Sequence, residues 1–353
     1  MPNRHNRGGA FLFEETAPDE VFTYEDFDDE CRMIAHTAAK FALNEVVPLK
    51  EKLEAPDSKN STNVQLLRRA GELGRLMTEI PEAYGGFAQR LSTTMLVSES
   101  ACKEPSFSAA MMCHTGIGTL PILLFGTPEQ REKYLPKLAT GEIIGAYALT
   151  ESGFGSDALG AKTSAVKSED GRSWILNGSK VFITNAGFAD LFSVYAKVDG
   201  EHFSAFIVEA DAEGLSLGPE EHKMGIKGSS TVALNLDNVR VPKENLLGEP
   251  GGGVPIALNV LNVGRFKLGA ADLGGCKLVI NQATQYALER IQFGQPIAYF
   301  EAIRKKLAEM VARTYMLDAA IYRTVGMMDE RITNLDPEDP KYAKRVMRAL
   351  EEY

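Results

Sequence analysis

The sequence has few cysteines and no excess of basic residues, and both shortages exclude classes of protein. Its 353 residues include only four cysteines, at positions 31, 102, 113 and 276, and no two of them form a Cys-x-x-Cys pair. This scatter indicates neither a zinc site nor a disulfide framework, so we expect no bound metal and a reducing compartment. Acidic residues outnumber basic residues by 48 to 38, and the net charge of −10 argues against non-specific binding to nucleic acid or anionic membranes.

Targeting and membrane signals are also missing from the sequence. No segment approaches the roughly 20 consecutive apolar residues that a membrane-spanning helix needs. Residues 1–13 are basic, but their apolar run is too short for a signal peptide, and the acidic residues that follow are unlike a transit peptide. We therefore expect a cytoplasmic protein with no integral membrane segment.

The hydrophobic pattern divides the chain into three zones that predict an α+β fold. Residues 1–141 have helical periodicity, residues 142–248 have the alternation and turn signals of strands, and residues 249–353 return to a helical period. No helical segment interrupts the middle zone, so its sheet should be mostly antiparallel. We predict an N-terminal helical domain, a middle antiparallel β domain and a C-terminal helical bundle that is incomplete.

Local signals predict several helix boundaries. Asp26 or Asp28 should cap a helix that stops at Pro48. The segment Thr127-Pro-Glu-Gln130 has the N-cap, N1 and N3 residues of a helix start. The last helix should begin near Pro340, and it reaches residues 351–353 without a capping glycine and with acidic groups at the end that its dipole disfavours. We therefore expect the chain to be cut within that helix.

In the middle zone, two dipeptides are typical of hairpin turns. Asp170-Gly171 and Asn177-Gly178 flank the apolar residues 174–176 and should bound a short strand. The run 203–208 is uniformly apolar, and residues 232–236 alternate as a strand with one buried face should.

The most informative segment is residues 147–157, Tyr-Ala-Leu-Thr-Glu-Ser-Gly-Phe-Gly-Ser-Asp. Because strands need side chains to pack, Gly153 and Gly155 indicate backbone that is held against a flat or anionic group. The hydroxyls of Thr150 and Ser156 could hydrogen-bond such a group. From these residues alone, a polar turn between two strands is an equal alternative.

Together with later segments, this loop resembles the acyl-CoA dehydrogenase family. The other matching segments follow the family's order over nearly the whole chain: 80–86, 177–180, 180–185, 224–227, 239–242 and 287–294. Phe154 departs from the pattern, because the family usually has a smaller residue there. Residues 224–230, with Val260 and Leu261, are most similar to the very-long-chain branch.

The resemblance implies FAD bound between the sheet and the C-terminal helices of a homodimer or homotetramer. The residues that it assigns to the flavin and its pyrophosphate are Tyr147, Leu149, Thr150, Gly155, Ser156, Phe182, Ile183 and Thr184. Arg290, Gln292 and Phe293 are similar to the segment that reaches the FAD of a neighbouring subunit. Without the family, Phe182 and Ile183 would be ordinary strand core. The match changes this interpretation for Phe182, and the side chain of Ile183 stays core.

Two residues are assigned to the substrate by the same resemblance. Ser156 would lie at the boundary between cofactor and substrate. Arg265 matches an arginine near the substrate in relatives, with a surface salt bridge as an equal alternative. For Arg290, the alternative is a solvated cation at a helix end.

The implied activity is fatty-acid β-oxidation, in which a fatty acyl-CoA is oxidised to a trans-2-enoyl-CoA and an electron-transfer flavoprotein accepts the electrons. A carboxylate removes the α-proton, and the flavin takes the β-hydride. In most relatives this base is a glutamate beyond the position that matches Tyr353. A minority place it just before the residue that matches Arg265, where this chain has Gly264. We therefore expect no catalytic base within these residues. The alternatives are an acyl-CoA oxidase and a non-catalytic binding or assembly protein of the same fold.

Overall fold

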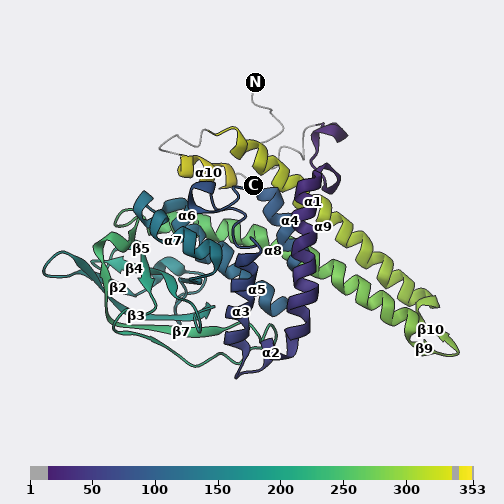
Figure 1. Ribbon diagram of the computed structural model, residues 1–353, viewed down its shortest axis with the longest axis horizontal. Coiled ribbons are helices and arrows are strands. Elements are labelled where there is room, and N and C mark those ends of the chain that lie inside the picture. The colour runs from purple at the N-terminus through teal and green to yellow at the C-terminus, as the bar shows by residue number, and fades with distance from the viewer. Residues whose placement is uncertain (1–14, 336–341, 352–353) are drawn as a thin grey trace. The chain divides into compact units, whose positions relative to one another are not determined.

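The computed structural model describes residues 15–335 and 342–351, and its helices and strands follow one another in three zones (Figure 1). The helices are α1 Asp29–Phe41, α2 Lys50–Glu54, α3 Lys59–Glu72, α4 Leu91–Ala101, α5 Pro105–Cys113, α6 Leu120–Phe125, α7 Pro128–Thr140, α8 Gly253–Glu289, α9 Glu301–Thr333 and α10 Tyr342–Glu351. The strands are β1 Gly145–Ala148, β2 Ser164–Lys167, β3 Ser173–Thr184, β4 Leu191–Val198, β5 His202–Glu209, β6 Leu215–Leu217, β7 Thr231–Pro242, β8 Leu246–Leu247, β9 Ile291–Gln292 and β10 Gln295–Pro296. This order confirms the predicted α+β fold. The predicted start of the last helix at Pro340 and its end at residues 352–353 lie outside the described residues.

The chain forms two compact units, each assembled from segments that are distant in sequence. Of the described residues, 44–89 and 104–265 form the sheet unit, and 15–43, 90–103, 266–335 and 342–351 form the long-helix unit. The predicted domains 1–141, 142–248 and 249–353 follow sequence order, and their limits stay a prediction.

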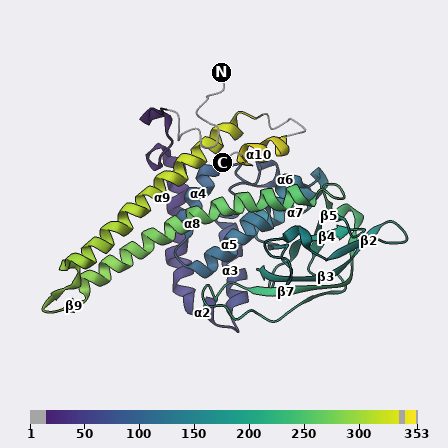
Figure 2. The ribbon, with the colours of Figure 1, turned by 180° about the vertical axis from the view of Figure 1, so that it is seen from behind.

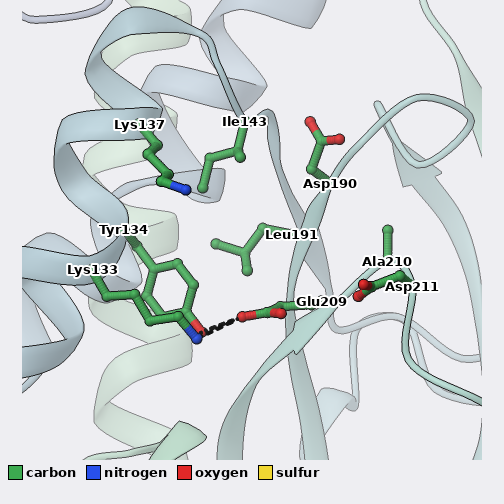
Figure 3. Close-up of a pocket in the computed structure, with 9 residues that line it drawn as sticks. All are labelled: Lys133, Tyr134, Lys137, Ile143, Asp190, Leu191, Glu209, Ala210 and Asp211. Carbon is green, nitrogen blue, oxygen red and sulfur yellow. Dashed lines mark hydrogen bonds and ion pairs between the residues drawn. The ribbon is translucent and has the colours of Figure 1, made fainter.

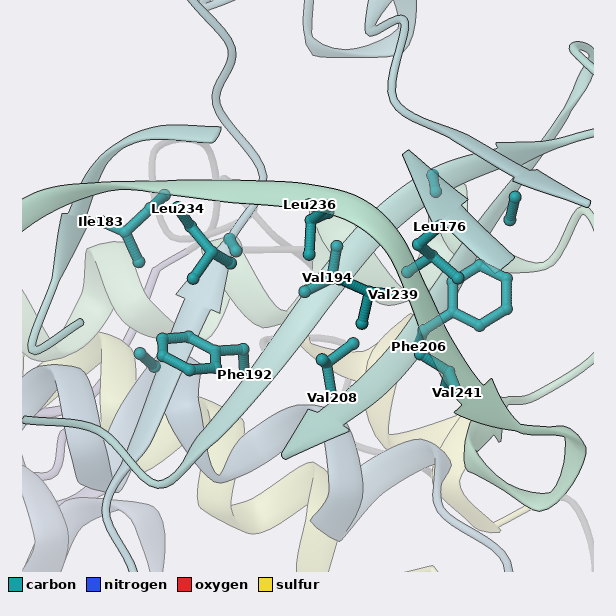
Figure 4. Close-up of a cluster of buried hydrophobic side chains, with 14 of the residues drawn as sticks. Leu176, Ile183, Phe192, Val194, Phe206, Val208, Leu234, Leu236, Val239 and Val241 are labelled. Carbon is teal, nitrogen blue, oxygen red and sulfur yellow. The ribbon is translucent and has the colours of Figure 1, made fainter. Parts of the chain in front are cut away.

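The sheet of the sheet unit has the strand order β6-β7-β3-β2-β4-β5-β8, with β1 beside β4. Strand β4 pairs in parallel with β1 and β2, and the other neighbours pair antiparallel. The prediction of a mostly antiparallel sheet is therefore confirmed. Apolar side chains from β3, β4, β5 and β7 point toward one another and form the core of this sheet (Figure 4).

One predicted turn is wrong. Asp170-Gly171 does form the turn between β2 and β3, with Gly171 at a φ of +68°. Asn177-Gly178 instead lies inside β3, where the pairing of β3 with β7 shifts register. Gly178 has a φ of +153°, and a Cβ there would lie 2.5 Å from Oγ1 of Thr163. The glycine is thus needed for a bulge and a close approach, which a local turn signal does not distinguish from a hairpin.

Two helix starts were predicted correctly and one helix end was not. Asp28 caps α1, accepting a hydrogen bond from the Cys31 amide at 2.8 Å. Thr127 and Gln130 form a capping box at the start of α7, with bonds of 3.2 and 2.9 Å. The chain does not leave the helical path at Pro48, because a π-helical and a 3-10 turn lead from α1 into α2. A proline in the first turn of a new helical segment removes only an N–H that has no intrahelical partner.

One stretch of the described chain is long and apolar enough to cross a membrane, contrary to the expectation from sequence. It is Pro105–Phe125, which contains α5, a π-helical turn at His114–Gly118 and α6. The protein buries 67% of its most apolar window. A buried core helix passes the same test of length and composition, so the stretch is weak evidence for a membrane span.

In the long-helix unit, α9 and the part of α8 that follows residue 265 run side by side, and the β9–β10 hairpin connects them (Figures 1 and 2). Leu273 of α8, Met95 of α4 and Tyr322 of α9 share one buried cluster. The ammonium of Lys277 lies 2.7 Å from Glu99 and 2.6 Å from Asp318, so an ion-pair network joins the same three helices.

Candidate functional site

The first predicted site residues, Tyr147 in strand β1 and Leu149 directly after it, are buried. Tyr147 and Leu149 are 7% and 6% exposed. The Tyr147 hydroxyl donates to the carbonyl of Ala257 at 3.1 Å, and its ring centroid lies 5.1 Å from that of Tyr195. Burial raises the pKa of Tyr147, although the charge of Arg265 acts in the opposite direction. Tyr147 is therefore a neutral core residue whose hydroxyl already has a partner.

The loop after β1 is open where its glycines lie. Gly153, Gly155 and Ser156 are exposed, and neither glycine has a left-handed backbone. A Cβ added to either glycine would meet no protein atom within 4 Å. Neither the backbone conformation nor the neighbouring protein atoms therefore require glycine at these positions. Residues 151–154 do form a tight turn, because the Glu151 amide donates to the Phe154 carbonyl at 3.2 Å and the Phe154 amide donates to the Glu151 carbonyl at 3.0 Å. Since this turn does not itself require the two glycines, the open space beside them fits a cradle for a ligand as well.

Phe154, the residue out of the family pattern, has contacts of its own. A Cβ on Gly160 would come within 2.5 Å of the Phe154 ring, and the ammonium of Lys162 lies 5.7 Å from the ring centroid. The ring therefore lies against the chain just before β2.

Strand β3 presents Phe182 on a second bulge. The register of β3 against β7 shifts between Lys180 and Ile183, and the amide of Val181 donates instead to the carbonyl of Thr150 at 2.9 Å. Phe182 has a φ of +60° and is 63% exposed. A left-handed backbone is costly for a bulky residue, and an exposed ring gains no packing in return. The structure thus places Phe182 as an available aromatic face beside the loop.

The residues after Phe182 anchor the end of the strand. Ile183 is 2% exposed and lies in the sheet core, as expected for its side chain, whereas Thr184 is half-buried. Asn185 is fully buried with a φ of +68°, and its amide donates to the carbonyl of Ala110 at 2.9 Å. The position of Thr184 is therefore set by contacts with α5 as well as by the sheet.

Sequence reasoning missed a buried ion pair between the two segments. The ammonium of Lys180 is fully buried and lies 2.7 Å from Oε1 of Glu151. Glu151 also accepts hydrogen bonds from the amides of Lys162 and Thr163 at 2.7 and 3.0 Å. Burial alone would raise the pKa of Glu151, but the Lys162 amide, Lys180 and Thr163 outweigh burial and lower this pKa to about 2. Both residues occur in the matched segments, but two charges in sequence do not reveal that they are buried together.

His114 and Gly118 both contact Gly145 at the start of β1. Nδ1 of His114 accepts from the amide of Gly145 at 3.1 Å, and Nε2 lies 2.9 Å from the carbonyl of Leu138. These partners fit the neutral tautomer with the proton on Nε2. Gly118 lies so close to Gly145 that a Cβ on Gly118 would meet backbone atoms of Gly145 at 2.7 Å.

The remaining predicted residues fall in two places. Arg265 is exposed on α8 of the sheet unit, and its Nη1 donates to Oδ1 of Asn262 at 2.6 Å. Arg290, Gln292 and Phe293 belong to the hairpin region of the long-helix unit, and all three are exposed. The sheet unit thus brings together the predicted residues of β1, its loop and β3.

A cavity of about 380 Å³ in the sheet unit contains none of the predicted residues (Figure 3). Helix α7 supplies Lys133 and Tyr134, which donate to Glu209 of β5 at 2.8 and 2.7 Å. Asp190 and Lys137 also line it, so its charges are mixed and largely paired. Within residues 15–335 and 342–351, no group of three or more His, Cys, Asp or Glu side chains is placed to hold a metal ion.

Comparisons with known proteins agree with one another. Residues 28–142, 146–239 and 251–348 match the N-terminal, middle and C-terminal domains of the acyl-CoA dehydrogenases. A probable acyl-CoA dehydrogenase of Bacillus subtilis (strain 168) is 48% identical over 98% of this chain and 58% of its own length. An acyl-CoA dehydrogenase of the same organism is 39% identical over 84% of this chain and 78% of its own length.

A solved structure gives the same result. The crystal structure of an acyl-CoA dehydrogenase complexed with FAD from Bacillus anthracis matches with a TM-score of 0.95 and 51% identity. The match covers 98% of this chain and 59% of that one. The chain therefore spans less than two thirds of the length of this structure and of the first relative.

Proposed function

This chain belongs to the acyl-CoA dehydrogenase family, and from that premise we propose that the whole protein is an FAD-dependent acyl-CoA dehydrogenase. The observation that carries the proposal is the exposed, left-handed Phe182 beside a loop whose glycines face open space. A flavin needs an apolar face and a few directed polar groups, and these residues fit it. The related structure that contains FAD supports the same cofactor.

The chain's own residues would bind and orient the cofactor. Phe182 would cover one apolar part of the flavin, and Thr184 and Thr150 would direct hydroxyls to it. Gly155 and Ser156 would admit the pyrophosphate, because no side chain blocks the backbone there. When bound, FAD would supply the acceptor for the β-hydrogen of the substrate.

The proposed substrate is a fatty acyl-CoA, which loses its α- and β-hydrogens to become a trans-2-enoyl-CoA. Ser156 and Arg265 would contact it, and the Arg265 guanidinium is exposed on α8. The α-proton would pass to a glutamate beyond Tyr353, and the electrons would leave through an electron-transfer flavoprotein. Similarity to the very-long-chain branch suggests a long acyl chain.

The proposal includes a homodimer or homotetramer in the cytoplasm. Ile291 and Phe293 are 59% and 93% exposed, and such apolar exposure on a hairpin supports its use as a contact between copies. Arg290 and Gln292 beside them would then reach the FAD of the neighbouring copy. A reducing compartment, in which the four cysteines stay free thiols, is part of the same proposal.

The test uses the purified whole protein. We expect bound FAD, loss of its visible absorption when acyl-CoA thioesters are added without oxygen, and formation of the 2-enoyl product. A series of acyl chain lengths then identifies the preferred substrate. A protein that contains no flavin and gains none on reconstitution would overturn the proposal.

Two other outcomes identify the alternatives. Peroxide release in air without an added electron acceptor would indicate an acyl-CoA oxidase. Flavin binding without any bleaching by thioesters would indicate a binding or assembly protein that retains the fold.

A further inference from the structure

The two segments of the proposed flavin site are not joined by the pairing of the sheet. Strand β1 pairs with β4, whereas β3 pairs with β2 and β7. Ladder hydrogen bonds therefore do not fix the loop at residues 150–156 against the bulge at residues 181–184. Another set of contacts must set their relative position, because one ligand would have to touch both.

Three polar contacts cross this junction, and two of them come from Lys180. Its ammonium lies 2.7 Å from Oε1 of Glu151 and 3.2 Å from the carbonyl of Leu149. The third is the 2.9 Å hydrogen bond from the Val181 amide to the carbonyl of Thr150. Lys180 and Val181 of β3 thus contact the three consecutive residues that follow β1.

We propose that the Glu151–Lys180 ion pair is a positioning latch that holds the loop and the Phe182 bulge in the relation that the flavin requires. The inference rests on the proposed function, since it assigns a role within the same site. The latch acts through the backbone of Thr150 and Val181, so neither Glu151 nor Lys180 touches the reacting atoms.

The Glu151 carboxylate also accepts hydrogen bonds from the segment that precedes β2. Oε1 of Glu151 accepts from the Thr163 hydroxyl at 2.5 Å and from the Thr163 amide, and Oε2 accepts from the Lys162 amide. Gly178 of β3 also approaches Thr163 closely. Strand β3 therefore contacts this group of hydrogen bonds at two places, at Glu151 through Lys180 and at Thr163 through Gly178. Glu151 is 8% exposed and Lys180 is fully buried, so water cannot replace either partner.

The energetics of buried ion pairs favour positioning over stability as the role. Desolvation offsets most of the attraction, so replacing both partners by neutral groups of similar size often leaves stability unchanged. Removing one partner is different, because the other charge stays buried and unpaired. A stabilising role and a positioning role therefore predict different results for single and double variants.

The test compares Lys180→Met, Glu151→Gln and the double variant in the whole protein. We expect amide hydrogen exchange in the flavin-free protein to accelerate roughly tenfold or more at residues 150–156 and 181–184 in each single variant, because a charge-assisted hydrogen bond is lost. We expect the FAD dissociation constant to rise by a similar factor and the absorption spectrum of the bound flavin to shift. In the double variant, thermal stability should recover while FAD affinity and loop protection stay low.

An exposed ion pair of the same unit gives the matched control. Lys137 and Glu142 are 3.3 Å apart with side chains 51% and 63% exposed, so Lys137→Met and Glu142→Gln should change neither exchange at the loop nor FAD affinity. Normal FAD affinity and loop protection in the double variant would overturn the latch, as would a uniform increase in exchange across the sheet. If the wild-type protein bound no FAD, the proposed function would fail, and the exchange comparison would still decide whether the latch exists.

Discussion

At residue 182, a phenylalanine has a left-handed backbone and an exposed ring, and neither feature stabilises the fold. Such strain typically persists where a site requires it. We predict that Phe182→Gly raises the free energy of unfolding by about 1 kcal/mol, because glycine adopts this backbone without strain. The same variant should weaken FAD binding about tenfold, since the aromatic face is lost. Chemical denaturation and flavin titration measure the two effects.

The control for this prediction is Phe182→Trp, which keeps an aromatic face and should keep FAD affinity. A Phe182→Gly variant that is less stable than the wild type would contradict the assignment of strain to this residue.

The lowered pKa of the Glu151 carboxyl predicts how the stability of the fold depends on pH. Its pKa is lowered from 4.5 to about 2 in the folded protein, so its ionised form stabilises the fold above pH 4.5. This contribution should be lost as the pH falls from 4.5 toward 2, because near pH 2 the carboxyl becomes protonated in the folded protein as well as in the unfolded chain. Unfolding measured at several pH values should show a smaller acid-induced loss in Glu151→Gln than in the wild type. Equal losses in the two proteins would show that Glu151 is not held as a carboxylate.

At the scale of elements, the fold uses glycine for two different reasons. Gly118, in the turn before α6, faces backbone atoms of Gly145 at the start of β1, whereas Gly155 faces open space. We predict that Gly118→Ala destabilises the protein by about 1–3 kcal/mol, because the two backbones must move apart. Gly155→Ala should change stability by less than about 0.5 kcal/mol and weaken FAD binding. Thermal unfolding with flavin titration separates the two, and a destabilised Gly155→Ala variant would argue against an open cradle.

The elements also show where local signals succeed. The Thr127 capping box and the alternation in β7 were predictable, because each depends on residues within a few positions of one another. The bulge at Gly178 and the continuation of helix past Pro48 were not, since β7, Thr163 and the following turns decide them.

At the scale of the whole molecule, the exposed hairpin of the long-helix unit predicts self-association. Phe293→Asp should reduce the molar mass measured by light scattering to that of a smaller assembly, because a buried charge in the contact is costly. The stability of the single chain should not change, since the side chain is 93% exposed. Met224→Asp, at an equally exposed apolar residue of the sheet unit, is the control and should leave the mass unchanged. An unaltered mass for Phe293→Asp would remove the hairpin from the proposed interface.

The sequence by itself determined the family resemblance, the order of helical and strand zones and the segments that form the candidate site. These features are carried by periodicity and by short ordered motifs, which do not depend on distant contacts. Only the tertiary structure decided that Lys180 and Glu151 are buried together, that Phe182 is strained and exposed, and that Gly118 meets Gly145. Each of these depends on residues far apart in the chain, and burial and backbone strain arise only when those residues come together.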